Sequence, residues 1–369
     1  MKVFVVFGTR PEAIKMCPLV LELKKHKEIE CVVCLTGQHR EMLKQVMDAF
    51  AIEADINLDI MKDRQTLTTI TTSILEKMEP VLKEHKPDVV LVHGDTTTSY
   101  AAALAAFYQQ IPVGHVEAGL RTGDIYSPFP EEMNRLMTDR LSTYYFAPTK
   151  KNQENLFAEN VKEKVYVTGN TVIDAFKYTV SDDYTFSNEV MGKVFARQDR
   201  KTVLITAHRR ENLGKPLENI CNAIAEIAKK NEDIDFIYPV HLNPAVREVA
   251  FAVLSGIPNV YLTDPVDVLD MHNALSRCFM VMTDSGGLQE EAPSFGKPVL
   301  VLRTETERPE AVEAGTVLVV GNEKTEIVNA ALELINNEES YNRMSKAINP
   351  YGDGKASERI AKVLLGEVL

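Results

Sequence analysis

The first half of the chain alternates short apolar, β-branched runs with longer stretches of helical periodicity. Residues 3–7 and 31–35 are typical of buried strands, and amphipathic stretches follow them from Pro11 and His39. The same alternation pairs residues 89–93 with 99–108, 113–116 with 131–141, and 165–167 with 171–179. This pattern predicts a parallel sheet covered by helices on both faces.

The alternation lapses in a polar, charged stretch at residues 181–201 and then restarts. The second series of strand and helix patterns covers residues 203–206, 217–229, 236–240, 246–254, 260–262, 268–275, 279–283, 287–293 and 299–302. We therefore predict an α/β fold of two Rossmann-like, doubly wound domains. Because such sheets bind ligands beyond the carboxyl ends of their strands, we expect the active site in a cleft that the two domains face.

The predicted domains are residues 1–170, with the candidate catalytic acids, and residues 171–350, with the nucleotide site. The amphipathic segment 356–365 is expected to cross back, so that residues 351–369 complete the first domain. A chain of 369 residues is long enough for two separate cores.

Composition and charge narrow the class of partner. The chain is 45% hydrophobic and 25% charged, and its apolar runs are too short to cross a bilayer, which predicts a soluble protein with no membrane partner. A net charge of −12 and the lack of a basic stripe argue against nucleic acid. Five cysteines without paired metal spacing indicate a reduced, cytoplasmic chain.

A glycine-containing turn in the second half is the best candidate for a phosphate site. Ser285, Gly286 and Gly287 follow an apolar strand and open a helix, where backbone N–H groups can approach an anion closely. Glu291 lies one turn further on and suits a pair of ribose hydroxyls. An ordinary strand-to-helix turn is the alternative interpretation.

The end of the first strand offers two cations. Arg10 and Lys15 belong to a segment without the spacing of a dinucleotide fingerprint or a P-loop, so it predicts neither NAD nor ATP as a cofactor. Both side chains could face the cleft and neutralise phosphate charge. Each alone is also compatible with a solvated surface cation.

Three carboxylates follow strands or open helices in the first half. Asp95 has a competing interpretation as a helix N-cap, and Glu131, beside Glu132, could simply complement the helix macrodipole. Glu117 is harder to dismiss, because capping does not require Glu and an idle charge at a strand end is costly. Three acids at one cleft would raise one another's pKa values, as acid–base chemistry requires.

His208 ends the first strand of the second half and is the histidine we assign to transition-state chemistry. The remaining histidines are interpreted as surface, capping or core residues: His26, His39, His85, His93, His115, His241 and His272. No His, Asp or Cys cluster has ligand spacing, so no metal is indicated.

Seven motifs together resemble the bacterial non-hydrolysing UDP-N-acetylglucosamine 2-epimerases, almost end to end. They are GTRPE at residues 8–12, HGDT at 93–96, HVEAGLR at 115–121, PEEMNR at 130–135, TAHRREN at 206–212, TDSGG at 283–287 and NPYGDG at 349–354. The resemblance implies the two-domain fold of one glycosyltransferase class (GT-B), a homodimer, and no nicotinamide or metal. The product, UDP-N-acetylmannosamine, would supply N-acetylmannosamine for cell-surface polysaccharide.

The resemblance also implies a mechanism and residue roles. UDP is eliminated to give 2-acetamidoglucal and is then added back after protonation of the opposite face of carbon 2. The implied acids are Asp95, Glu117 and Glu131, with His208 at the departing diphosphate. The implied UDP ligands are Arg10, Lys15, Ser285, Gly286, Gly287, Glu291 and Arg308, with Val266, through its backbone, and Met271 at the uracil. Many relatives carry an aromatic residue in place of Met271.

Several members of that family bind a second UDP-N-acetylglucosamine as an activator. The matching positions here are Gln38, His39, Arg64, Gln65, Arg209 and His241. Three other functions stay open at this point: a hydrolysing 2-epimerase that releases N-acetylmannosamine and UDP, a retaining glycosyltransferase, and a non-catalytic nucleotide-sugar sensor. A transferase needs an acceptor site and has less use for three acids at carbon 2.

Overall fold

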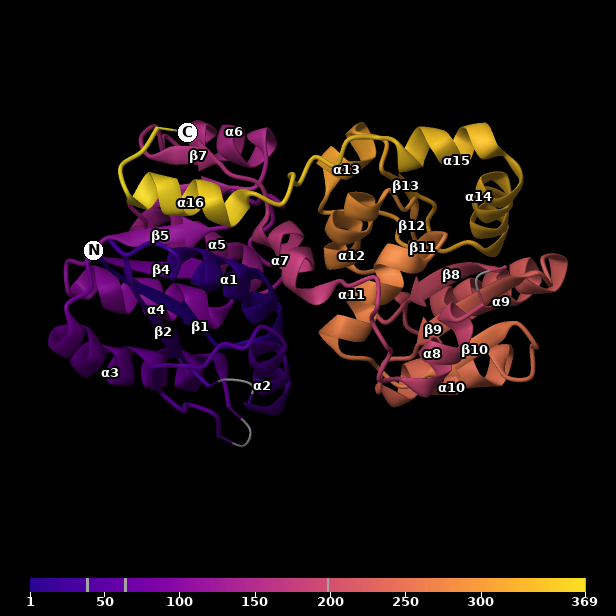
Figure 1. The fold of residues 1–369 in the computed structure, drawn as a ribbon, viewed down its shortest axis with the longest axis horizontal. Helices are drawn as coiled ribbons and strands as arrows, with labels where there is room; N and C mark the ends of the chain where they lie inside the picture. Colours follow the sequence, from indigo (N-terminus) through magenta and orange to yellow (C-terminus); the bar gives the residue numbers. More distant parts are fainter. Residues whose placement is uncertain (38–39, 63–64, 198, 369) are drawn as a thin grey trace. The chain divides into compact units, whose positions relative to one another are not determined.

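The computed structural model describes residues 1–37, 40–62, 65–197 and 199–368. The chain forms two compact units, residues 1–178 with 351–369 and residues 179–350 (Figure 1). Each unit is built on one parallel sheet with helices along it, so the predicted α/β class with two doubly wound sheets is confirmed.

Over the described residues, the sheet of the first unit has seven parallel strands in the order β3-β2-β1-β4-β5-β6-β7. Its strands are β1 (Lys2–Phe7), β2 (Glu30–Leu35), β3 (Ile56–Asn57), β4 (Val89–His93), β5 (Val113–Val116), β6 (Tyr144–Ala147) and β7 (Val165–Val167). The order reverses between β1 and β4, which pair directly. The carboxyl ends of these two strands are therefore the edge at which a doubly wound sheet binds its ligand.

The helices of the first unit are α1 (Arg10–Leu23), α2 (Arg40–Ala49), α3 (Leu67–His85), α4 (Thr97–Tyr108), α5 (Glu131–Leu141), α6 (Lys150–Ala158), α7 (Thr171–Thr179) and α16 (Ala356–Leu364). The last of these, α16, packs against α1 although it comes from the end of the chain (Figure 1). Asp174 of α7 accepts from the backbone N–H groups of Ala356 and Ser357, at 3.1 and 2.9 Å. It thus satisfies two N–H groups that the start of α16 leaves without an intrahelical partner.

In the part of the second unit that the structure describes, the sheet has six strands in the order β10-β9-β8-β11-β12-β13. Its strands are β8 (Lys201–Thr206), β9 (Ile234–Pro239), β10 (Val260–Thr263), β11 (Met280–Thr283), β12 (Val299–Val301) and β13 (Val317–Val319). Here the order reverses between β8 and β11, whose last residues, Thr206 and Thr283, are paired in register. Their hydroxyls hydrogen-bond at 2.6 Å, so the loops after the two strands start side by side.

The helices of the second unit are α8 (Glu189–Phe195), α9 (Lys215–Lys230), α10 (Pro244–Leu254), α11 (Val268–Arg277), α12 (Gly286–Glu291), α13 (Pro309–Glu313), α14 (Lys324–Asn336) and α15 (Glu338–Ser345). Short 3-10 turns cover Arg210–Asn212 and Ala292–Phe295.

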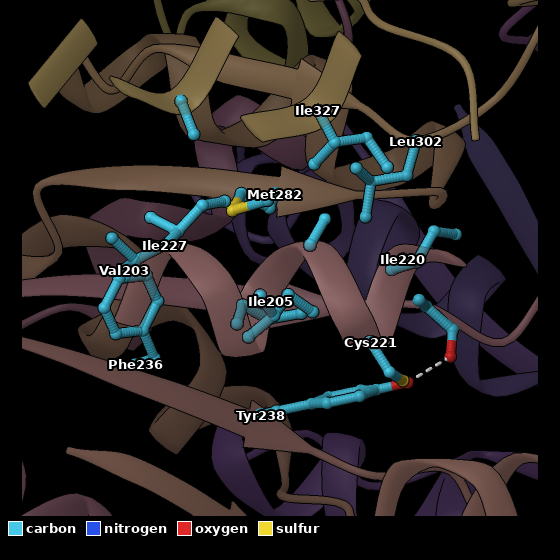
Figure 2. Close-up of a cluster of buried hydrophobic side chains, with 14 of the residues drawn as sticks. Val203, Ile205, Ile220, Cys221, Ile227, Phe236, Tyr238, Met282, Leu302 and Ile327 are labelled. Atoms are coloured by element: carbon cyan, nitrogen blue, oxygen red, sulfur yellow. Dashed lines mark hydrogen bonds between the residues drawn. The ribbon is translucent and has the colours of Figure 1, made fainter. Parts of the chain in front are cut away.

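The core of this unit forms where α9 covers one face of the sheet (Figure 2). Val203 and Ile205 of β8 point to the same face, two residues apart, as the pleat of a strand requires. Tyr238 of β9 is fully buried beside them, and its hydroxyl donates to the carbonyl of Ala207 just beyond β8. The core therefore fixes the point at which the chain leaves β8 toward His208.

Candidate active site

Glu117 follows directly on β5 and sits in strained backbone. Its φ of +68° lies in the left-handed region, which residues with a side chain rarely adopt. Its side chain is only 9% exposed, and both carboxylate oxygens contact Lys15 Nζ, at 2.8 and 2.9 Å. His93 Nε2 lies 2.7 Å from Glu117 Oε2. The predicted phosphate-facing cation Lys15 is therefore an ion-pair partner of a predicted catalytic acid.

Asp95 lies just beyond β4, and helix capping does not explain it. Thr96 caps α4 by accepting from the Ser99 backbone N–H at 3.1 Å. The Asp95 carboxylate instead accepts from the buried guanidinium of Arg135, and its carbonyl accepts from Asn134 Nδ2 at 2.9 Å. The Asp95 side chain remains 30% exposed, so it combines a fixed position with access from solvent.

The two neighbouring acids at the start of α5 have different surroundings. Glu132 is buried and accepts from the backbone N–H groups of Thr122 and Gly123, at 3.0 and 3.1 Å, and from Arg135 at 2.9 Å. Glu131 is half-buried, and within the described part of the chain its carboxylate has no hydrogen bond or ion pair. Glu132 thus holds the preceding loop, while Glu131 keeps its oxygens available.

The contacts bring the predicted acids onto adjacent segments of the first unit. Arg135 and Asn134 tie Asp95 to the first turns of α5, the helix that begins with Glu131. The backbone N–H of Gly94 donates to Val116 at 2.9 Å, which places the residues after β4 and β5 next to each other. Asp95, Glu117 and Glu131 therefore belong to one edge of one sheet.

A buried charge network supports this edge, and the sequence did not reveal it. His115 Nδ1 lies 2.6 Å from Asp139 Oδ1, and its Nε2 lies 2.7 Å from the carbonyl of Gly94. Both ring nitrogens therefore face oxygen atoms, and these two contacts fix the orientation of the ring. Burial acts to raise the pKa of Asp139, but His115 and Arg121 together hold that pKa below its usual range. The network fixes the carbonyl that precedes Asp95.

Glu12 is a second buried acid that the sequence did not reveal. It accepts from the backbone N–H groups of Gly8 and Thr9, at 3.0 and 2.7 Å. Its other oxygen accepts from the hydroxyls of Thr96 and Ser99, at 2.6 and 3.0 Å. Glu12 therefore joins the loop after β1 to the loop after β4. Arg10, the first residue of α1, directly follows the loop after β1 and is half-buried.

In the second unit, Asp284 joins the loop after β8 to the turn after β11. Its Oδ2 accepts from the backbone N–H groups of His208 and Arg209, both at 2.8 Å, and from Asn212 Nδ2 at 3.0 Å. Ser285 follows it directly. The predicted transition-state histidine is therefore held next to the predicted phosphate turn.

Two guanidinium groups flank that turn. A methyl group added to Gly286 would lie 3.8 Å from a terminal nitrogen of Arg209 and equally far from one of Arg308. Arg308 is buried, and its Nε donates to the carboxylate of Glu290. Arg209, a predicted regulatory residue, thus lies at the same turn as the predicted UDP ligand Arg308.

His208 and His241 stack with ring centroids 5.0 Å apart and ring planes 19° from parallel. Burial lowers the pKa of His208; the Asp284 carboxylate opposes this shift, whereas His241 and Arg209 add to it. The ring of His208 is therefore neutral near pH 7. A predicted catalytic residue and a predicted regulatory residue share one stack.

The predicted uridine ligands lie around α11. Val266 is nearly buried just before this helix, and Met271 is half-buried on it. His272, the next residue, has Nε2 3.5 Å from Glu291 Oε2, at the end of α12. The structure therefore brings Glu291 to the same helix as Met271.

The remaining predicted regulatory positions are only partly described. Gln65 is half-buried and donates to the carbonyl of Ile60 at 2.6 Å. Gln38, His39 and Arg64 lie outside the described residues.

Among the residues with described placement, no group of three or more His, Cys, Asp or Glu side chains could hold a metal ion. None of the helices traced there combines the length and the apolar character that a bilayer crossing demands.

Comparison with known proteins identifies the family. A family profile described as UDP-N-acetylglucosamine 2-epimerase matches residues 21–365. The chain belongs to the UDP-N-acetylglucosamine 2-epimerase family. It is 55% identical over 366 residues to the UDP-N-acetylglucosamine 2-epimerase of Bacillus subtilis, covering 99% of this chain and 95% of the relative. It is 54% identical over 369 residues to the enzyme of that name from Escherichia coli K12, covering 99% and 98%.

Solved structures of the same family match the chain over all or nearly all of its length. The Neisseria meningitidis UDP-GlcNAc 2-epimerase bound to UDP-GlcNAc is 52% identical, with a TM-score of 0.92 and all of both chains covered. The Methanocaldococcus jannaschii enzyme in complex with UDP-GlcNAc and UDP is 35% identical, with a TM-score of 0.81 and 99% and 100% covered. The UDP-N-acetylglucosamine 2-epimerase family that the seven motifs indicated is therefore confirmed.

Proposed function

We propose that the protein is a non-hydrolysing epimerase that interconverts UDP-N-acetylglucosamine and UDP-N-acetylmannosamine at carbon 2 of the sugar. The names of the Bacillus subtilis and Escherichia coli relatives support the activity, and the Neisseria meningitidis complex with UDP-GlcNAc supports the substrate. The observation that carries the proposal is the set of three acids at one sheet edge. Their surroundings differ: Asp95 pairs with Arg135, Glu117 pairs with Lys15, and the Glu131 carboxylate has no hydrogen bond or ion pair within the described residues, which suits a reaction with separate proton removal and delivery.

The first half-reaction is an elimination. A carboxylate removes the proton from carbon 2, and the electron pair of that C–H bond forms the double bond to carbon 1. The bond from carbon 1 to the diphosphate oxygen breaks, so 2-acetamidoglucal and UDP result. The hydrogen on carbon 2 is weakly acidic, which is why its removal has to be coupled to the departure of a good leaving group.

The second half-reaction reverses the bond changes on the other face of the sugar. A protonated carboxyl group delivers a proton to the opposite face of carbon 2, and the diphosphate oxygen of UDP re-forms its bond to carbon 1. Three carboxyl groups allow one to remove the proton and another to return it. No water is consumed, so keeping water from the glucal is part of the catalyst's task.

The diphosphate is assigned to the second unit, with cations from the first. His208 donates a hydrogen bond to the departing diphosphate, and Arg308 and Arg10 balance its charge. Ser285, Gly286 and Gly287 contribute the turn against which it lies. Contacts of this kind lower the elimination barrier because they strengthen as charge collects on the leaving group. Lys15 is assigned to the diphosphate through the family resemblance, and in this structure it pairs with Glu117.

The uridine is assigned to Val266, Met271 and Glu291, with Glu291 accepting from the ribose hydroxyls. We further propose a cytoplasmic homodimer whose product supplies N-acetylmannosamine for cell-surface polysaccharide. A second UDP-N-acetylglucosamine would act as an activator, bound by residues matched through the family: Gln38, His39, Arg64, Gln65, Arg209 and His241.

Incubation with UDP-N-acetylglucosamine in deuterium oxide tests the reaction. The expected result is deuterium at carbon 2 in both epimers, with UDP-N-acetylmannosamine as product and no added cofactor. Accumulation of free N-acetylmannosamine and UDP would instead identify a hydrolysing enzyme. Absence of any label in recovered substrate and product would contradict proton exchange at carbon 2 and with it the proposal.

A further inference from the structure

His272 is a buried histidine that the proposed mechanism leaves without a role. It lies on α11, and only 2% of its surface is exposed. Its Nδ1 is hydrogen-bonded to the hydroxyl of Thr179 at 2.8 Å, and its Nε2 lies 3.5 Å from Glu291 Oε2. The ring therefore touches two polar groups that are far apart in the sequence, one at each nitrogen.

The surroundings of Glu291 make this contact specific. Its side chain is only 13% exposed, and it folds back over the start of its own helix: a methyl group added to Gly287 would lie 3.1 Å from Oε1. One carboxylate oxygen thus lies over Gly287, where only glycine leaves this much space, and the other faces His272. Of these two neighbours, His272 is the one whose side chain can donate a hydrogen bond to the carboxylate.

The other side of the ring is anchored at the start of the second unit. Thr179 is the first residue of that unit and is buried. Its carbonyl accepts from Asn273 Nδ2 at 2.7 Å, and Asn273 Oδ1 accepts from the backbone N–H of Ser181 at 3.1 Å. Thr179 is thus fixed to α11 independently of His272. Its hydroxyl can therefore hold the imidazole of His272 in one orientation.

We propose that His272 is a positioning residue that orients the Glu291 carboxylate for the ribose hydroxyls of the uridine nucleotide. The Nε2–H group faces Oε2 and stabilises the carboxylate in the plane that two adjacent hydroxyls need, while Thr179 holds Nδ1. The distance of 3.5 Å shortens to a hydrogen bond when the ribose engages Glu291, as polar contacts in ligand-free sites commonly do. This inference rests on the proposed role of Glu291 in UDP binding.

Two substitutions of His272 test the contact at Nε2 separately from the contact at Nδ1. His272→Gln places an amide N–H near the position of Nε2 and keeps a donor toward Glu291. His272→Asn keeps a polar group only near Nδ1, beside Thr179. The binding of UDP and of 2′,3′-dideoxyuridine 5′-diphosphate to the full chain is measured by calorimetry, with thermal unfolding as a check that each variant is folded.

We expect His272→Asn to weaken UDP binding about tenfold, the equivalent of one hydrogen-bonded contact. The same variant should bind the dideoxy nucleotide as the unsubstituted protein does, and His272→Gln should restore most of the UDP affinity. Introduced together with Glu291→Gln, His272→Asn should add little, because the two residues act through the same hydroxyls.

Equal weakening of both nucleotides by His272→Asn would overturn the proposal, because a general packing defect does not distinguish them. Failure of the proposed role of Glu291 gives another result: the unsubstituted protein would then bind UDP and the dideoxy nucleotide equally. Should His272→Asn not fold, a normal preference for UDP in folded His272→Leu would overturn the proposal, and a lost preference would support it.

Discussion

Lys15 Nζ contacts both carboxylate oxygens of Glu117, at 2.8 and 2.9 Å, and the two side chains are 14% and 9% exposed. The pair joins α1 to the residue after β5 across 102 positions of sequence. A carboxylate that water barely reaches depends on such a partner, because an unpaired buried charge is costly. The position of a proposed catalytic acid therefore depends on a lysine from another strand–helix unit.

Replacing this lysine should damage catalysis more than nucleotide binding. We expect Lys15→Met to lower kcat about 100-fold, the usual contribution of one acid–base group. UDP affinity should fall less than tenfold, because Arg308 and the turn at Ser285 remain. Steady-state kinetics and calorimetry measure the two effects. Lys44→Met is the matched control, since Lys44 pairs with Asp48 on the exposed surface; a similar loss in both variants would argue against the specific pairing.

The three proposed acids should each be needed for turnover. We expect Asp95→Asn, Glu117→Gln and Glu131→Gln to lower kcat by about 100-fold or more, and to change UDP affinity only a few-fold. Wash-in of deuterium at carbon 2 is the sharper readout, because it reports proton exchange even when little product forms. Unchanged turnover in all three variants would rule out the acid–base assignment.

Glu132, the neighbour of Glu131, provides the contrast to these variants. Its carboxylate holds the backbone of Thr122 and Gly123 and contacts Arg135. We expect Glu132→Gln to lower the free energy of unfolding by about 1–3 kcal/mol, the cost of poorly satisfied buried partners. Urea unfolding checks this. If Glu131→Gln destabilised the fold as much as Glu132→Gln, its loss of activity would be structural.

The sequence predicted most of the fold because buried parallel strands are nearly continuous apolar runs. It missed several elements, and two of them bury little. Helix α8 forms inside the polar stretch where the alternating pattern lapses, and only Met191 and Val194 on it are buried. Strand β13 lies at the sheet edge, and of its residues Val317 alone is buried. Short elements of this kind take their structure from neighbours that a local pattern does not contain.

For the candidate site, the sequence located positions but not pairings. Strand ends identified the segments of Asp95 and Glu117, whereas the contacts of Glu12 with Thr96 and of Asp284 with His208 span 84 and 76 residues. Such partners meet only because β1 lies beside β4 and β8 beside β11. The order of the strands is a property of the whole sheet, so histidines such as His115 were interpreted as ordinary core residues. The catalytic roles stay predictions.

The buried network around Asp139 should make stability depend on acid pH. Because His115 and Arg121 hold its pKa below the unfolded value of about 3.9, the ionised carboxylate stabilises the folded state. This contribution is fully present above the unfolded pKa and is lost as pH falls through the lower, folded pKa. We expect Asp139→Asn to reduce the urea midpoint strongly at pH 7 and less below about pH 3.5. A difference that stays constant with pH would show that charge is not the cause.

His208 should show the opposite dependence on pH. It is a base, and burial lowers its pKa. The unfolded chain then binds a proton at this position more readily than the folded protein, so stability rises with pH through the region below the ordinary histidine pKa of about 6.5. Removing the group should flatten that rise. We expect the free energy of unfolding of His208→Gln to change less between pH 5 and 7 than that of the unsubstituted protein. Urea titrations at closely spaced pH values measure both slopes.

A second variant tests the stacked histidine. Because His241 stacks on His208 and helps to lower its pKa, His241→Gln should shift the slope in the same direction but less. Identical slopes in all three proteins would mean that the surroundings of His208 do not hold its ring neutral.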